Sequence, residues 1–240
     1  MDLNRKRMNA GITAEDNRSE LSAGSTVTLE ITAYGSEGQG IARHNGMAVF
    51  VPGAICGETV EAEIKKAAPS FAEAKLQKIL RPSAERVIPP CPHYAECGGC
   101  DILHMSYAEQ LRMKRETVRS AMERIGGFRG IEILPCIGAD KPEHYRNKAV
   151  FQFANAEKTN KKNLRQVLSG YYEQKSHKLV PVETCMIQNE EAMTAKRIVA
   201  EWANLFDIRA FDEKQKSGTL RQLMAVSYTH LRAHETRRHL

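Results

Sequence analysis

Hydrophobic and polar residues alternate in several short stretches near the start of the chain. Residues 27–31 and 60–64 each place an apolar side chain at every second position, which is typical of strands with one buried face. An apolar run at 47–51 and a stretch at 72–80 predict two further strands. Glycines punctuate residues 35–40, which we expect to be turn-rich. Short strands joined by glycine turns predict a small closed β-barrel.

Two helices are predicted further along the chain. Ser106 and Glu109 have the spacing of a capping box, and Gly126-Gly127 provides a stop for the first helix. A second helix is predicted at about residues 190–206. The apolar residues predicted to face a core are Leu111, Val118, Met122 and Ile125 in the first helix, and Ala195, Ile198, Val199, Trp202 and Phe206 in the second.

The remaining periodic segments predict strands at 149–153, 167–172 and 220–225. Together with the helices they predict an α+β fold, with a barrel followed by a second domain of mixed α and β structure. The expected division is a disordered arm at 1–21, a barrel at 22–83, a second domain at 84–225 and a separate tail at 226–240.

Composition excludes several classes of protein. The chain is 42% hydrophobic, yet no apolar run approaches the roughly 18 residues that a membrane-spanning helix requires. The N-terminus lacks the apolar segment of a signal peptide. We therefore expect a monomeric cytoplasmic protein without a membrane partner. Its six cysteines should be reduced, which favours metal binding or catalysis over disulfides.

The positive charge is concentrated in one part of the sequence. The formal net charge is +6, but acidic and basic residues cancel over 1–21 and again over 22–81. Residues 141–178 contain nine Lys or Arg against three Glu, a local excess of +6. Such a segment is typical of a surface that docks a polyanion.

Four cysteines form the clearest chemical motif. Cys91, Cys97 and Cys100 lie within ten residues, and Cys185 follows 85 residues later. Three nearby thiolates can hold one side of a metal centre and a distant fourth can close it. We expect the intervening Gly98-Gly99 to let the backbone approach the sulfurs and donate N–H groups to them.

Spacing alone leaves two metal centres open. Structural zinc sites usually carry two separate C-x-x-C pairs, and only one such pair is present here, so an iron–sulfur cluster is favoured over zinc. His93 and His104 flank the motif and are potential substitute ligands, although a surface or capping role is favoured. Cys56 and Cys136 do not fit the spacing, and we interpret them as free thiols.

These motifs together resemble the S-adenosylmethionine-dependent RNA (uracil-5-)-methyltransferases, in particular the branch that acts on 23S ribosomal RNA. Residues 22–81 resemble the family's TRAM domain, an OB-like barrel that binds RNA. The segment from Cys91 to Cys100 resembles its cluster loop. The segments that resemble the central domain, which carries the fourth ligand, are 145–149, 170–172, 176–177 and 182–185.

The resemblance implies a [4Fe–4S] cluster held by Cys91, Cys97, Cys100 and Cys185. It implies RNA as the partner, most specifically 23S ribosomal RNA, through stacking rings and phosphate-binding cations. Arg146, Lys148 and His177 are the candidate RNA contacts. Phe151 and Phe153 alternate with a polar residue and are predicted to lie in the core instead.

Enzymes of this family attack C6 of uracil with a cysteine, which makes C5 nucleophilic towards the cofactor's methyl group. The catalytic cysteine, the base and the S-adenosylmethionine site belong to a C-terminal Rossmann-like domain. No glycine motif of that domain follows Ala225, so no catalytic residue is assigned and the chain alone is expected to be inactive. S-adenosylmethionine is expected as a cofactor of a full-length enzyme only.

The tail at 226–240 departs from the preceding strand pattern. Its first part, VSYTHLRAHET, resembles a translated sequencing adapter, so we expect the true sequence to differ after Ala225. Two other functions remain open: a stand-alone RNA-binding module with a structural zinc, and a redox protein whose cluster carries electrons.

Overall fold

The computed structural model describes residues 21–159 and 165–227, so the predictions of an arm at 1–21 and of a separate tail lie almost wholly outside the described residues. The chain divides into two compact units, residues 1–84 and 85–240. Among the described residues, no helix is both long enough and apolar enough to cross a membrane. Each unit has its own core.

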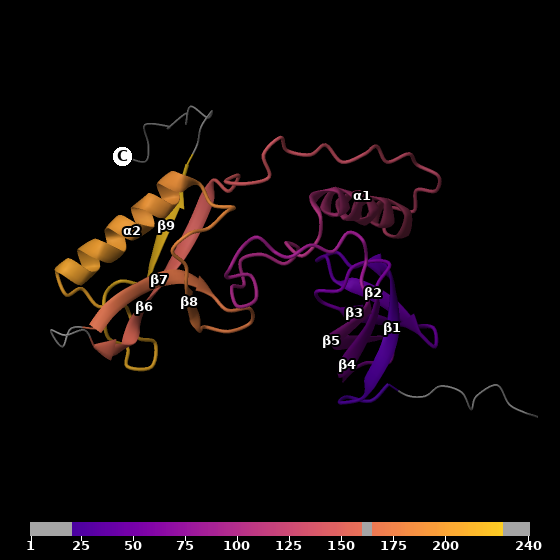
Figure 1. The fold of residues 1–240 in the computed structure, drawn as a ribbon, viewed down its shortest axis with the longest axis horizontal. Helices are drawn as coiled ribbons and strands as arrows, with labels where there is room; N and C mark the ends of the chain where they lie inside the picture. Colours follow the sequence, from indigo (N-terminus) through magenta and orange to yellow (C-terminus); the bar gives the residue numbers. More distant parts are fainter. Residues whose placement is uncertain (1–20, 160–164, 228–240) are drawn as a thin grey trace, which may run out of the picture. The chain divides into compact units, whose positions relative to one another are not determined.

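The first unit contains a closed five-stranded barrel (Figure 1). Its strands are β1 (Thr26–Tyr34), β2 (Gly40–His44), β3 (Met47–Val51), β4 (Thr59–Ala67) and β5 (Phe71–Arg81), in the order β1-β2-β3-β5-β4. β3 and β5 pair in parallel, and the other neighbours pair antiparallel. The predicted barrel is confirmed, but the turn-rich interpretation of residues 35–40 overlooked β2, which starts at Gly40.

The alternating positions fill the barrel interior as the two-residue period predicts. Leu29 and Ile31 of β1 are 2% exposed, and Val60, Ala62 and Ile64 of β4 are fully buried. These side chains form one cluster with residues of β3 and β5. Because the strands contribute one face each, burial of that face drives barrel closure.

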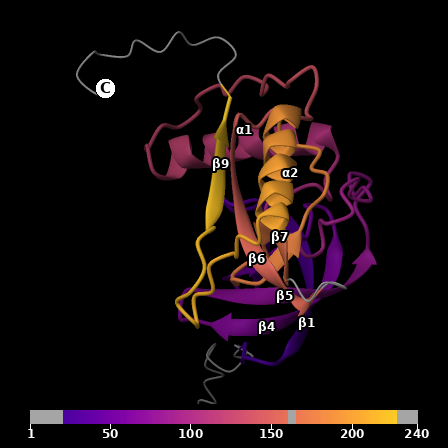
Figure 2. The same cartoon turned by 90° about the vertical axis from the view of Figure 1, so that its left-hand side faces the viewer.

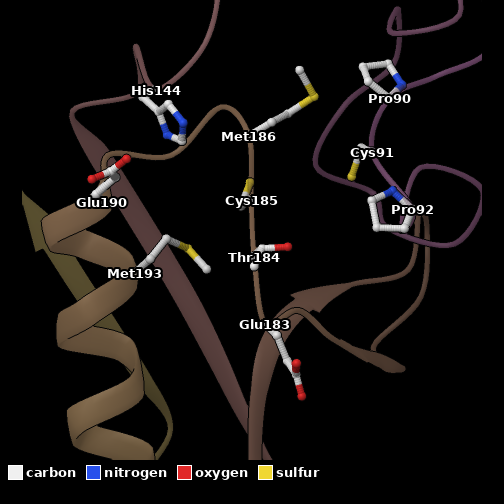
Figure 3. Close-up of a pocket in the computed structure, with 10 residues that line it drawn as sticks. All are labelled: Pro90, Cys91, Pro92, His144, Glu183, Thr184, Cys185, Met186, Glu190 and Met193. Carbon is white, nitrogen blue, oxygen red and sulfur yellow. The ribbon is translucent and has the colours of Figure 1, made fainter.

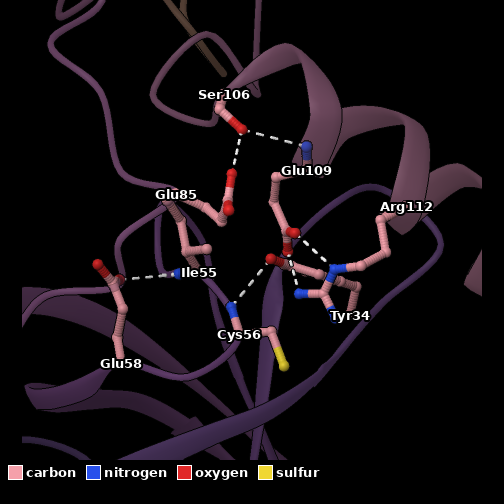
Figure 4. Close-up of polar contacts among 8 residues, drawn as sticks. All are labelled: Tyr34, Ile55, Cys56, Glu58, Glu85, Ser106, Glu109 and Arg112. Atoms are coloured by element: carbon pink, nitrogen blue, oxygen red, sulfur yellow. Dashed lines mark hydrogen bonds and ion pairs between the residues drawn. The ribbon is translucent and has the colours of Figure 1, made fainter.

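One carboxylate lies inside the barrel unit. Glu58 is fully buried, and its two oxygens accept hydrogen bonds from the backbone N–H groups of Ile55 at 2.9 Å and Ser83 at 3.3 Å (Figure 4). Its own carbonyl accepts from the N–H of Ile31 at 2.9 Å. Glu58 thus ties the β3–β4 connection to β1 and to the end of the barrel chain, and it satisfies donors that would otherwise be buried without partners.

The second unit contains an antiparallel sheet and two helices. Its sheet has the order β8-β7-β6-β9, with β6 (Lys148–Thr159), β7 (Arg165–Tyr172), β8 (Leu179–Pro181) and β9 (Gln222–Val226). Helix α2 (Glu190–Leu205) lies along one face of this sheet (Figures 1 and 2). β8 was not predicted, and β9 includes Val226, which we had assigned to the tail.

The predicted buried face of α2 is correct for Val199, which packs against the core, but wrong for its large apolar residues. Ile198, Trp202 and Phe206 are 55%, 48% and 64% exposed. The face on the sheet is instead formed by Ala192, Lys196, Val199 and Ala203. Ala203 packs with Phe153 and Ala192 with Phe151, and these two rings of β6 are buried in the core, as predicted.

Helix α1 (Tyr107–Arg124) begins and ends where the sequence predicts. The Ser106 hydroxyl caps the N–H of Glu109 at 3.2 Å, and Gly127 follows with a φ of +70°. The capping box is not reciprocal, because the Ser106 N–H donates to the Glu85 carbonyl and its hydroxyl also contacts the Glu85 carboxylate (Figure 4). Its predicted apolar face is only partly covered, since Leu111 and Met122 are half-buried whereas Val118 is 50% and Ile125 is 88% exposed.

We predict that Glu58→Ala destabilises the barrel by about 1–3 kcal/mol, because the N–H groups of Ile55 and Ser83 lose their acceptor. Glu58→Gln keeps one carbonyl oxygen in place and should cost less. Hydrogen exchange of peptides from residues 26–81 measures the effect, and fluorescence of Trp202, the sole tryptophan, serves as the control for the second unit. Equal protection in both variants and the parent would contradict this role.

Candidate metal centre

Three of the four predicted ligands lie in the irregular segment that precedes α1. Successive turns shape it: the N–H of Tyr94 donates to the Cys91 carbonyl at 3.2 Å, and the N–H of Cys97 donates to the His93 carbonyl at 2.8 Å. The Tyr94 hydroxyl donates to the Asp101 carbonyl at 2.8 Å and lies 2.6 Å from His104 Nδ1. Tyr94 therefore closes the cysteine loop on itself, and burial raises its pKa to about 12.

The fourth ligand comes from the segment between β8 and α2. Lys196 of α2 is buried at 6% exposure, and its ammonium donates to the carbonyl of Val182, three residues before Cys185. Asn189 caps α2 by accepting from the N–H groups of Glu191 and Ala192. Both ends of the segment are thus tied to the helix, which sets the position of Cys185.

The fold brings the four predicted cysteines together. All four line one pocket, whose other lining residues are His93, Tyr94, Gly99, Arg146, Tyr171, Val182, Ile187 and Gln188. Figure 3 shows Cys91 and Cys185 on two chain segments that face each other across an adjoining pocket, with Pro90 and Pro92 beside the first thiol and Met186 beside the second.

Burial and neighbouring charges shift the pKa values of two of the thiols. Burial raises the pKa of Cys97, and it raises the pKa of Cys100 to about 11. Cys91 and Cys185 add to both increases by charge repulsion, whereas the Arg146 guanidinium opposes them. Within residues 21–159 and 165–227, no three His, Cys, Asp or Glu side chains converge as ligands of one metal ion.

The two glycines of the loop have different environments. Gly98 pairs with the end of β7, where its N–H donates to the Tyr172 carbonyl at 3.0 Å, and an added Cβ would lie 2.9 Å from that oxygen. Gly99 lies beside Cys97, whose Sγ would be 3.3 Å from an added Cβ, and its N–H lowers the pKa of the Cys97 thiol. The expected approach to sulfur thus holds for Gly99, whereas Gly98 is needed for close contact with the sheet.

The other candidate ligands and thiols lie in different places. His93 lines the cysteine pocket, while His104 is 3% exposed and faces Tyr94. Cys56 belongs to the barrel unit, where its N–H donates to the Tyr34 hydroxyl at 3.0 Å. Cys136 follows α1 and does not line the pocket. All six cysteines are free thiols.

The three candidate RNA contacts do not form one group. Lys148 is exposed at the start of β6. The side chain of His177 is 74% exposed, and its ring stacks parallel to that of Tyr172 with the centroids 5.2 Å apart. Its Nδ1 lies 3.1 Å from a carboxylate oxygen of Glu213. The Arg146 side chain instead lines the cysteine pocket.

Two further residues of the pocket were not predicted. The Tyr171 hydroxyl and Gln188 Oε1 are both buried, and neither has a hydrogen-bond partner in the part of the chain that the structure describes. The Gln188 amide is near enough to oppose the burial that raises the pKa of Tyr171, but it makes no hydrogen bond of acceptable geometry with the hydroxyl. Tyr171 belongs to the segment 170–172 that resembles the central domain, but nothing in the sequence assigns it or Gln188 to the cysteine site.

Comparison with known proteins places these features in a family context. Residues 20–76 match the family described as the TRAM domain. An uncharacterized RNA methyltransferase of Clostridium tetani is 41% identical over 200 residues, which are 83% of this chain and 42% of the relative. A second, from Halalkalibacterium halodurans, is 37% identical over 216 residues, 89% of this chain and 45% of the relative.

A solved structure shares the fold. The tRNA (uracil-54, C5)-methyltransferase of Pyrococcus abyssi, in complex with S-adenosyl-L-homocysteine, superposes with a TM-score of 0.55 at 22% identity. The match covers 82% of this chain and 42% of that one. The chain spans less than half the length of the relatives it matches, and it is homologous to the N-terminal part of RNA methyltransferases that carry a TRAM domain.

Proposed function

We propose that this chain is the RNA-binding and cluster-binding portion of an S-adenosylmethionine-dependent RNA (uracil-5-)-methyltransferase that acts on ribosomal RNA. The observation that carries the proposal is that four thiols from two distant chain segments line one pocket. They belong to a chain that carries an RNA-binding barrel and is related to RNA methyltransferases. Methyl transfer itself is assigned to the remainder of a full-length enzyme.

The spacing of the cysteines supports an iron–sulfur cluster over zinc, since structural zinc sites usually carry two separate C-x-x-C pairs and this set contains one. A zinc ion holds sulfur ligands at about 2.3 Å, so its four thiolates must close tightly around one point. A [4Fe–4S] cluster has an iron at each of four corners, so its thiolates surround a larger body. Four thiols line the pocket, one for each iron of such a cluster.

The polar atoms of the pocket fit the same group. The Tyr171 hydroxyl is a buried donor without an acceptor, and such a group is costly unless a partner arrives. Cluster sulfides and thiolates accept hydrogen bonds. When bound, the cluster would join the Cys91–Cys100 loop to the Cys185 segment and so stabilise the second unit.

The basic segment supports RNA as the partner. Lys148 offers an exposed cation, and the stacked pair of His177 and Tyr172 offers a flat surface on which a base can stack. The Tyr172 carbonyl receives the Gly98 N–H, so this surface is attached directly to the cysteine loop. We therefore propose Lys148 and His177 as RNA contacts, of which His177 lies on the surface attached to the cysteine loop.

We predict that Cys185→Ser abolishes cluster binding. Anaerobic reconstitution of the parent chain should yield about four iron and four sulfide with a broad brown absorbance, as the composition of a [4Fe–4S] cluster requires. The variant should lose both and unfold more readily by Trp202 fluorescence, because metal binding and folding are coupled.

Cys136→Ser is the matched control, since Cys136 does not line the pocket and its loss should leave the iron content unchanged. Equal loss of iron in both variants would refute the ligand assignment. One colourless zinc in the parent would instead identify the zinc module, and a cluster without RNA affinity would favour an electron carrier.

For RNA, we predict that affinity for a ribosomal RNA fragment falls steeply with salt, and that Lys148→Ala reduces the logarithmic slope by about 0.7–0.9. His177→Ala should weaken binding by about tenfold with little change in slope, since stacking contributes roughly 1–3 kcal/mol per base. Fluorescence anisotropy of the cluster-loaded chain measures both effects.

Arg197→Ala provides the control for a lost surface cation, because Arg197 is 63% exposed on α2 and pairs with Glu201. Its slope should match that of the parent. Salt-independent binding would contradict the RNA surface, and tighter binding to transfer RNA than to ribosomal RNA would overturn the proposed target.

A further inference from the structure

Arg146 connects the two segments that carry the cysteines. Its Nη2 donates to the carbonyl of Gly99 at 3.2 Å, within the three-cysteine loop. Its backbone N–H donates to the Ile187 carbonyl at 2.9 Å, and its own carbonyl accepts from the Asn189 N–H at 3.4 Å. The main chain of Arg146 is thus fixed to the Cys185 segment while its side chain is fixed to the loop.

The Arg146 guanidinium carries more N–H donors than its contact with Gly99 uses. The group carries five N–H donors, and the contact with Gly99 uses one of them. Arg146 lines the pocket with all four thiols. A fixed positive charge therefore lies beside the site where thiolates would gather.

Tyr171 presents a second donor to the same pocket. Its ring packs against Phe151 at a centroid distance of 5.4 Å, which fixes the side chain in the core of the second unit. Its hydroxyl is buried without a hydrogen-bond partner. A rigid ring with an unsatisfied hydroxyl at the pocket wall is suited to donate to whatever the pocket holds.

We propose, on the basis of the cluster assignment above, that Arg146 and Tyr171 position the cluster and set its reduction potential. The guanidinium and the hydroxyl would both donate to its sulfur atoms. Hydrogen bonds and positive charge stabilise the reduced cluster, which carries one more negative charge than the oxidised form, and thus raise its potential. Arg146 is then a residue of the metal site and not a contact for RNA phosphate.

The experiment compares the parent chain with Arg146→Met, Arg146→Lys and Tyr171→Phe after anaerobic reconstitution. Iron and sulfide are counted, and a redox titration is followed by electron paramagnetic resonance. At the parent's midpoint potential, Arg146→Met should decrease the ratio of reduced to oxidised cluster about tenfold, which corresponds to about 59 mV for one electron.

Tyr171→Phe should shift the ratio in the same direction by a smaller factor, and Arg146→Lys should recover part of the shift because it keeps the charge. Arg129→Met is the matched control, since Arg129 is exposed and does not line the pocket. Its ratio should equal that of the parent.

The outcomes separate this inference from the proposed function. A parent chain that binds no cluster refutes the proposed function itself. A loaded parent whose midpoint is unchanged in Arg146→Met and Tyr171→Phe overturns the inference and leaves the cluster in place. If Arg146→Met does not bind a cluster, the midpoint potential of Tyr171→Phe tests the inference, because this variant removes only the hydroxyl. If Arg146→Met leaves the midpoint potential unchanged but makes RNA affinity less dependent on salt, Arg146 is an RNA phosphate contact instead.

Discussion

Main-chain hydrogen bonds that join two distant segments position the cysteine site on which the proposed role depends. The Gly98 N–H binds the last carbonyl of β7, and the Arg146 N–H binds the carbonyl of Ile187. Each bond contributes little by itself, about 1 kcal/mol. Together they place Cys185 beside three thiols that lie 85 or more positions earlier in the chain. The site is therefore a product of the second unit as a whole.

The sheet and α2 are arranged so that this pairing is possible. Gly170 allows β8 to lie close to β7, since an added Cβ would lie 1.9 Å from the Val180 carbonyl. Lys196 binds the carbonyl of Val182 from the buried face of α2, just before the Cys185 segment. A polar residue on the core face of a helix thus serves to fix the segment that carries a ligand.

The proposed RNA surface follows from the same architecture. The stack of Tyr172 and His177 continues from the strand that receives the cysteine loop. A cluster that orders this loop would also hold the aromatic surface in place, which gives a physical reason for a metal centre in an RNA-binding domain. The barrel, with buried Glu58 satisfying its backbone donors, is stabilised separately within the first unit.

Local patterns in the sequence determined the barrel strands, the start of α1 and the set of four cysteines. Alternation reports which side of a strand is buried, so Leu29 and Ile31 could be assigned to the core without a structure. The covered face of α2 could not be read in this way. Its large apolar residues form a helical stripe, yet the sheet is packed by Ala192 and Ala203, because the rings of Phe151 and Phe153 already fill the space between the helix and β6.

The tertiary structure alone decided which polar residues belong to the cysteine pocket. Arg146 lies in a basic segment and therefore resembles a phosphate contact in the sequence. Its guanidinium was placed beside the thiols by backbone pairing with Ile187, which depends on how β6 and the Cys185 segment meet. Tyr171 lies in a segment that the sequence singles out, and Gln188 does not, but no sequence pattern assigns either residue to the pocket. Spacing identifies ligands that are close in the chain, whereas the residues that surround a site are selected by contacts between distant segments.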